Sequence, residues 1–159
     1  MTKYTLEEKE SFIVLGIGTE LKSDYTDYVG MNKEKENFWR EVEQDGRLDA
    51  LKAVATNNYI FAVNEAVNHK RMYYAGVMTG ASTSQEHRVI QFPKGQYLVI
   101  TGEGKTANEL SSMLTGIAFG QVLPAADDFA YVGGPNATVE MGHHNGFVSG
   151  EMWIPVIKK

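Results

Sequence analysis

Residues 137–157 read ATVEMGHHNGFVSGEMWIPVI, and this stretch decides the fold. Apolar segments flank the turn sequence HHNG, a pattern that predicts an antiparallel pair of strands. Side chains alternate between the two faces of a strand. If the aliphatic set of each strand meets a covering layer, Glu140, Glu151 and Trp153 share the opposite, uncovered face. We therefore expect two carboxylates and an indole together on one face of a sheet.

The segments before this strand pair predict strands and a capped helix. Residues 87–101 are rich in strand formers and are interrupted at Pro93–Gly95, because proline removes a ladder donor. Thr106 and Glu109 have the spacing of a capping box, and an apolar stripe of helical period follows until Pro124. The second half thus has the order strand, helix, strand, strand.

The first half has the same order. SFIVLGIG at 11–18 predicts a strand buried on both faces, and NKEKENFWREVEQDG at 32–46 predicts a helix. Two further strands are predicted at 59–66 and 72–79. The repeated order indicates an internal duplication, although the two halves share little sequence.

The expected fold is α+β. We expect one domain over residues 1–159, with duplicated halves of roughly 1–82 and 83–159. Two such units side by side form one curved antiparallel sheet with two helices on one face. The face without helices is then either a ligand groove or an interface.

Carboxylates among aromatic rings suit large, flat, lipophilic cations, since a charge pair and ring faces both favour a cation. Strand alternation adds candidates from the first half, and a polar segment before the first helix adds two tyrosines that would form a lid if they fold over the groove. The candidate ligand-binding residues are Glu140, Glu151, Trp153, Tyr73, Tyr59, Phe61, Glu65, Tyr25 and Tyr28. Taken singly, a strand glutamate is more often solvent-exposed and a tryptophan or tyrosine is more often core packing.

Composition excludes several classes of function. The net charge of -5 and the mixed charges of residues 33–43 argue against direct DNA binding. There is no cysteine, His69 and His87 have no partner at metal-like spacing, and the adjacent His143 and His144 are interpreted as residues of the turn HHNG. No metal site or cofactor is therefore expected, and no hydrolase nucleophile motif is present. No leader sequence and no apolar run of about 20 residues is found, so we expect a cytoplasmic protein without a membrane association.

Several segments resemble the GyrI-like family, the effector-binding domains of AraC-type regulators in the SOUL and GyrI superfamily. The matching pieces are ESFIVLGIGTE, FPKGQYLVITGEG, the helix from Thr106, Glu140 in TVEM, and the closing EMWIPV. The resemblance covers nearly the whole chain. It implies a bacterial, regulation-related multidrug-binding module, in which Glu140 is the buried counter-charge for hydrophobic cations.

The resemblance leaves two alternatives open. One branch of the family hydrolyses cyclopropane-bearing DNA-alkylating compounds, and here Glu140, Glu151 and Tyr73 would be the catalytic residues. Another alternative is an inhibitor that acts through a protein partner such as DNA gyrase or a regulator. The physiological ligand and the oligomeric state stay undetermined at this stage.

Overall fold

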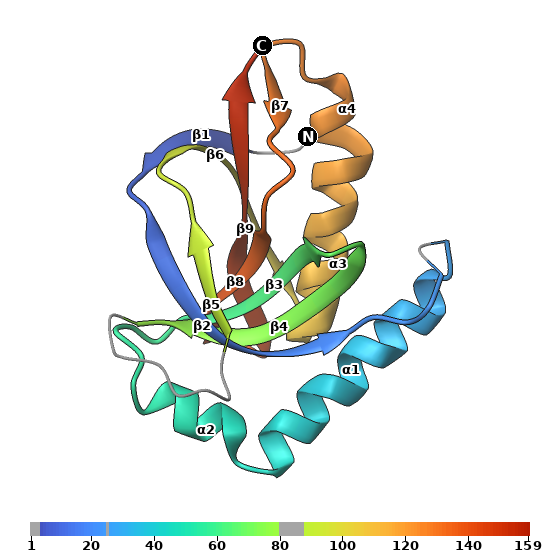
Figure 1. The fold of residues 1–159 in the computed structure, drawn as a ribbon, viewed down its shortest axis with the longest axis vertical. Coiled ribbons are helices and arrows are strands. Elements are labelled where there is room, and N and C mark those ends of the chain that lie inside the picture. The colour runs from blue at the N-terminus through green and yellow to red at the C-terminus, as the bar shows by residue number, and fades with distance from the viewer. Residues whose placement is uncertain (1–3, 25, 80–87) are drawn as a thin grey trace.

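The computed structural model describes residues 4–24, 26–79 and 88–159, which form one curled antiparallel sheet with helices on one face (Figure 1). The strand order is β1-β6-β9-β8-β3-β4-β2-β5, and β7 pairs with β9. The strands are β1 (Tyr4–Lys9), β2 (Phe12–Glu20), β3 (Ile60–Val67), β4 (Lys70–Met78), β5 (Arg88–Phe92), β6 (Gly95–Gly104), β7 (Phe129–Tyr131), β8 (Asn136–His144) and β9 (Phe147–Lys158). The helices are α1 (Tyr28–Gln44), α2 (Arg47–Lys52) and α3 (Ala107–Ile117), the last continued by a π-helical turn (Ala118–Val122) and α4 (Leu123–Ala125). The α+β class, the antiparallel sheet and the helices on one face are confirmed.

The strand order reads as two copies of one unit. β2, β4 and β3 have the same order and connections as β6, β9 and β8, and the two units meet where β3 pairs with β8. The strand that precedes each unit pairs with the other unit, since β1 pairs with β6 and β5 pairs with β2. The expected duplication is therefore visible in the topology. The strands β1 and β5, which precede the two units in the chain, are exchanged between them. The boundary between the expected halves falls outside the described residues.

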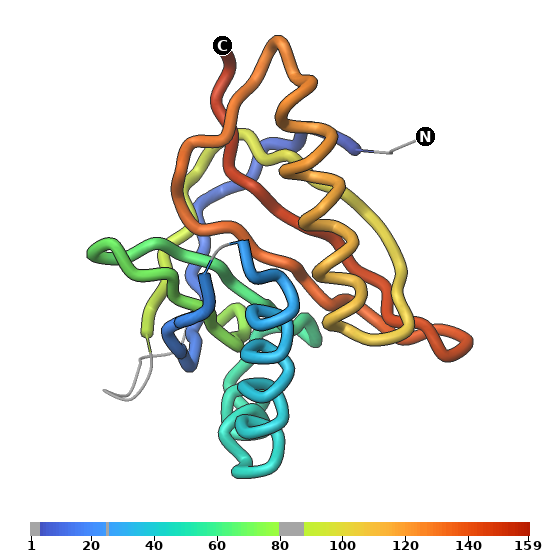
Figure 2. Tube along the Cα trace, turned by 90° about the vertical axis from the view of Figure 1, so that its right-hand side faces the viewer, coloured from blue at the N-terminus to red at the C-terminus, as the bar shows by residue number. Residues whose placement is uncertain are grey.

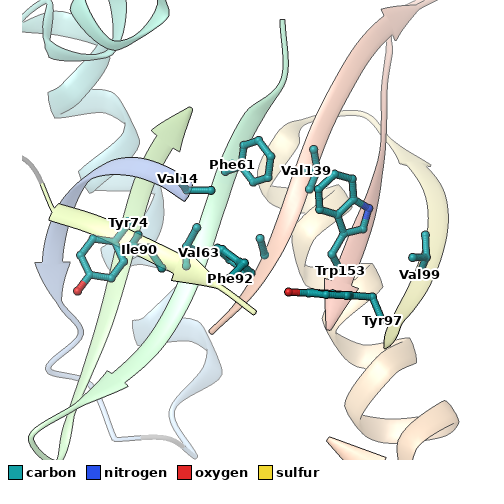
Figure 3. Packing of buried hydrophobic residues seen from close by; sticks show 11 residues of the cluster. Val14, Phe61, Val63, Tyr74, Ile90, Phe92, Tyr97, Val99, Val139 and Trp153 are labelled. Carbon is teal, nitrogen blue, oxygen red and sulfur yellow. The ribbon is translucent and has the colours of Figure 1, made fainter. Parts of the chain in front are cut away.

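The helix-free face is filled by its own side chains. The curl of the sheet brings aromatic rings from distant strands together (Figure 3). Phe12 stacks on Phe92 with ring centroids 4.6 Å apart, and Phe61 meets Trp153 edge to face at 5.7 Å. Such ring pairs contribute about 0.5–1.5 kcal/mol each beyond area burial. This face is a hydrophobic core rather than the open groove that we expected.

The opposite face carries two further cores beneath the helices. α1 and α2 cover the first unit, where Phe38, Val42 and Leu51 pack on β2 and β4. α3 covers the second unit, where Leu110 and Leu114 pack on β6 and β9. The beginning of α3 approaches α1 where the two units meet (Figure 2). Within the described ranges, none of these helices has the length and apolar character needed to cross a bilayer.

Local sequence signals explain several element ends. The hydroxyl of Thr106 accepts a hydrogen bond from the backbone N–H of Glu109 and caps α3, as its capping sequence predicts. Asn145 and Gly146 both have positive φ angles, which is the geometry of a tight hairpin turn between β8 and β9.

Strand β1 was not expected, because its sequence YTLEEK is largely charged. Charged residues are typical of an edge strand.

Candidate functional site

The prediction that Glu140, Glu151 and Trp153 share one face of the sheet is wrong. In the β8–β9 register Glu140 lies opposite Gly150, whereas Glu151 lies opposite Val139. Opposite residues share a face, and Val139 and Trp153 belong to the helix-free core. Glu140 therefore lies on the helix-covered face, and Glu151 and Trp153 lie on the other. Alternation along β8 correctly separated Ala137 and Val139 from Thr138 and Glu140. However, the apolar set packs in the helix-free core, and the more polar set, with Thr138 bonded to Ser111 of α3, meets the helices.

Glu140 lies in a groove of about 810 Å³ on the helix-covered face. The groove is bounded by α1 and α2 on one side and by the beginning of α3 and the end of β8 on the other. Its volume lies within the usual range for small-molecule sites. The lining residues are Glu36, Trp39, Arg40, Glu43, Leu48, Lys52, Ala55, Asn57, Asn58, Tyr59, Ile60, Val77, Thr106, Ala107, Asn108, Glu140, Met141, Gly142 and His143.

Among the described acidic residues that line this groove, Glu140 is the one for which an ion pair is seen. Its side chain is 22% exposed, and its Oε1 lies 2.9 Å from Nε2 of His143, which is 72% exposed. On the neighbouring strand it lies opposite Ile60, an apolar residue of the groove. The surroundings thus combine an apolar floor with a partly shielded negative charge, which favours a ligand that carries a positive charge.

Trp39 provides the aromatic wall of the groove. It lies on α1, and its indole Nε1 donates a hydrogen bond of 2.7 Å to the hydroxyl of Tyr73 on β4. Tyr73 is buried beneath the helix, and burial raises the pKa of its hydroxyl to about 12. Trp39, Tyr73 and Glu140 also line a small second hollow below the groove. Tyr73 therefore belongs to the floor near Glu140, on the helix-covered face.

Polar contacts between α1 and α3 close one end of the groove. Asn108 Nδ2 donates to Glu36 Oε1 at 3.0 Å, and Ser112 Oγ donates to Asn32 Oδ1 at 3.5 Å. The carboxylate of Glu36 is therefore engaged by an amide at the rim. Because these contacts join residues from the two structural units, the groove lies on the seam of the duplication.

Glu151 and Trp153 form a separate pair on the helix-free face. Trp153 Nε1 donates to Glu151 Oε1 at 2.9 Å, and the ammonium of Lys9 lies 4.0 Å from the centre of the indole ring. The expected arrangement of a carboxylate, an aromatic ring and a cation is present here. The cation belongs to the protein itself, and neither Glu151 nor Trp153 lines the groove that holds Glu140.

The remaining predicted residues are dispersed. Phe61 is buried in the helix-free core, and Glu65 forms an ion pair of 3.1 Å with Arg88 near that face. Tyr59 lines the groove and also packs against the helix-free core. Tyr28 is 71% exposed at the start of α1, and Tyr25 lies outside the described residues. Of the nine candidates, the groove thus brings together Glu140 and Tyr59, with Tyr73 beneath.

The alternative catalytic set is likewise divided. Glu140 and Tyr73 line the same small hollow, but Glu151 lies on the other face of the sheet. The hydroxyl of Tyr73 accepts its hydrogen bond from Trp39. Among the described residues, no three His, Cys, Asp or Glu side chains are grouped as a metal site. The structure therefore assembles at most one carboxylate and one tyrosine of the three expected catalytic groups.

The sequence analysis did not identify most of the groove residues, and Trp39 and His143 are the two that matter most for the site. Trp39 was recognised only as part of the apolar stripe of its helix, and nothing in that stripe indicates which of its members lies at the rim. His143 was interpreted as a residue of the turn HHNG, because adjacent histidines on opposite strand faces make poor metal ligands, and a regular strand would in addition place it on the face opposite Glu140. An irregularity in β8 changes that geometry, and no residue pattern signalled it.

The chain is thus an α+β domain with a curled antiparallel sheet, helices on one face and a groove where the two duplicated units meet. The chain belongs to the family of integron-associated effector-binding proteins (Cass2), whose sequence profile matches residues 5–156. The resemblance to GyrI-like effector-binding domains is thereby confirmed. No curated protein matches the chain.

Solved structures of low sequence identity share this fold. The protein SAV2435 bound to tetraphenylphosphonium is similar over 98% of this chain and 94% of its own, with 16% identity and a TM-score of 0.78. A Staphylococcus aureus MU50 protein, described as a candidate bacterial transcription regulation protein, is similar over 98% and 99%, with 17% identity and a TM-score of 0.74. An integron cassette protein from the mobile metagenome of Vibrio cholerae is similar over 97% and 95%, with 11% identity and a TM-score of 0.64.

Proposed function

We propose that the groove between α1 and α3 binds hydrophobic aromatic cations and that Glu140 is their counter-charge. The observation that carries this proposal is the partly shielded carboxylate of Glu140 on the floor of a groove of about 810 Å³. Trp39 offers an aromatic surface at the wall, and Ile60 and Val77 offer apolar contact. The chain would then act as a sensing or sequestering module for such compounds.

The charge pair and the ring contact both favour a cation. A pair of unit charges about 4 Å apart gains roughly 4 kcal/mol at an effective dielectric constant of 20, before the cost of desolvation. A cation over the face of a tryptophan gains about 0.5–2 kcal/mol. An anion of the same size would meet the carboxylate of Glu140 without compensation. The groove therefore discriminates more strongly between ligand charges than between ligand shapes, because stacking on one ring tolerates ligands of many shapes.

The comparisons support the same class of ligand. The family is described as effector-binding, and one structure of the same fold holds tetraphenylphosphonium, a hydrophobic cation with four aromatic rings. A ligand of about 25 non-hydrogen atoms, at about 0.3 kcal/mol per atom, gains about 7.5 kcal/mol. This corresponds to a dissociation constant in the low micromolar range.

The test compares two probes of the same shape and opposite charge. Tetraphenylphosphonium and tetraphenylborate both have four phenyl rings around one central atom, so apolar contact is matched and only the sign of the charge differs. We expect saturable micromolar binding of the phosphonium by titration calorimetry and at least tenfold weaker binding of the borate. Equal affinities would rule out a site centred on the Glu140 carboxylate. Tighter binding of the borate would show that the groove prefers anions, which contradicts the proposal.

A further inference from the structure

A β-bulge in β8 turns His143 toward Glu140. Glu140 pairs with Gly150, but Gly142 pairs with Ser149, so β8 has one extra residue, Met141, between two consecutive positions of β9. Residues three apart in a regular strand lie on opposite faces. The extra residue restores a common face, and a bulge commonly redirects a side chain in this way beside a functional site.

The partners across the hairpin confirm this common face. His143 lies opposite Val148, which packs in the core beneath α3, and Glu140 lies opposite Gly150 on the same side of β9. The result is the distance of 2.9 Å between His143 Nε2 and Glu140 Oε1. The imidazole is largely exposed, so it lies over the carboxylate from the solvent side of the groove.

The charged groups that face this pair come from two helices. α1 contributes Glu36, Arg40 and Glu43 to the groove lining, and α2 contributes Lys52. The described parts of α3, β3 and β4 that line the groove contribute no charged side chain. Glu36 is bonded to Asn108, and Arg40 is bonded to Asn37. His143 is the one group among these whose ion pair with Glu140 is seen in the structure.

We propose that His143 is an internal competitor for Glu140, which a bound cation must displace and which couples ligand affinity to pH. The inference rests on the proposed cation site. A protonated imidazole holds the carboxylate as an ion pair, whereas a neutral imidazole makes no charge pair with it. The ligand cation and the proton on His143 therefore exclude one another at a shared carboxylate. His143 thereby limits which cations bind, because a ligand displaces the imidazolium only if it interacts more favourably with the carboxylate of Glu140.

The direction of the pH effect follows from this exclusion. Protonation makes the imidazole the internal cation at the carboxylate, and histidine is the side chain whose charge changes in the physiological pH range, so acidification weakens binding of the ligand. Exclusion of one proton changes the affinity by at most about tenfold per pH unit, so we expect a loss on the order of tenfold between pH 7.5 and pH 5.5. By reciprocity, binding of a permanent cation in the acidic range releases protons, at most about one per site.

The test titrates tetraphenylphosphonium, whose charge does not depend on pH, into three proteins at pH 5.5 and 7.5. We expect about tenfold weaker binding at pH 5.5 for the unmodified chain and less than twofold for His143→Gln. His144→Gln is the matched control, because His144 is exposed and bonded to Asn145. This control is expected to keep the tenfold change. Calorimetry in buffers of different ionisation enthalpy then counts the protons released at pH 5.5.

The outcomes separate this inference from the proposed site. Absence of phosphonium binding at pH 7.5 overturns both. Binding at pH 7.5 with the same pH dependence in the unmodified chain and His143→Gln overturns the competition alone, and so does a flattened response in His144→Gln. Folding of each variant is checked by thermal unfolding, and little change is expected because both side chains are exposed.

Discussion

The indole Nε1 of Trp39 donates a hydrogen bond of 2.7 Å to the hydroxyl of Tyr73, and this bond joins α1 to the sheet beneath the groove. Because Trp39 is also the aromatic wall, the position of the wall depends on a buried hydroxyl of the floor. The bond thus links the stability of the first structural unit to the shape of the candidate site.

A double-mutant cycle measures this link. Trp39→Phe and Tyr73→Phe each remove one partner and keep an aromatic ring, including the edge-to-face contact between Phe38 and Tyr73 at 5.9 Å. A net hydrogen bond contributes about 0.5–1.5 kcal/mol, so we expect a coupling free energy of about 1 kcal/mol from urea unfolding. Strictly additive effects would show that the bond makes no contribution in solution.

Alkaline unfolding tests the burial of Tyr73. Burial raises the pKa of its hydroxyl to about 12, whereas an unfolded tyrosine ionises near pH 10. Between these values the unfolded chain has lost the proton and the folded chain keeps it. Stability is therefore fully present below about pH 10 and falls by up to about 1.4 kcal/mol per pH unit for this group as pH rises toward 12.

The variant Tyr73→Phe isolates this group from the others. Burial also raises the pKa of Tyr97 to about 12, so the unmodified chain loses stability through at least two tyrosines. We expect a shallower dependence of the unfolding free energy on pH between 10 and 12 for Tyr73→Phe. An unchanged slope would indicate that the hydroxyl is reached by solvent.

A substitution at Gly150 tests the close approach of β8 and β9 beside Glu140. A Cβ at Gly150 would overlap the carbonyl oxygen of Val139, whereas a Cβ at Gly142 has its nearest neighbour, Ser149 Oγ, at an ordinary 3.6 Å. We expect Gly150→Ala to lower the unfolding free energy by about 1–3 kcal/mol through forced strand separation. Gly142→Ala is the control and should cost much less. Equal effects in urea unfolding would contradict the register at the bulge.

Sequence patterns located the elements better than they located the site. The cap at Thr106 and the turn at Asn145–Gly146 are local devices, so the residues themselves indicate them. The face of Glu140 depends on which face of β8 the helices cover, and in this curled sheet both faces are largely buried, including the polar residue Thr138 on the face of Glu140. Ala137 and Val139 look like a helix-facing set, yet they pack in the core of the helix-free face.

The contact between His143 and Glu140 could also not be predicted from the sequence. It depends on one extra residue in β8, and that residue is visible only when the partner strand is in place. The groove itself arises from the distance between two helices that lie far apart in the sequence. Local periodicity determines the helices, but packing on a shared sheet determines the space between them.

The central claim is that Glu140, and not another acidic residue, holds the ligand cation. Glu140→Gln and Glu151→Gln make the same chemical change on opposite faces of one sheet, and Glu151 lies beside Trp153 with the protein's own Lys9. Titration of both variants with tetraphenylphosphonium at pH 7.5 is the most direct measurement. We predict at least tenfold weaker binding for Glu140→Gln and less than twofold change for Glu151→Gln. Unchanged affinity in Glu140→Gln, or a larger loss in Glu151→Gln, would contradict the account.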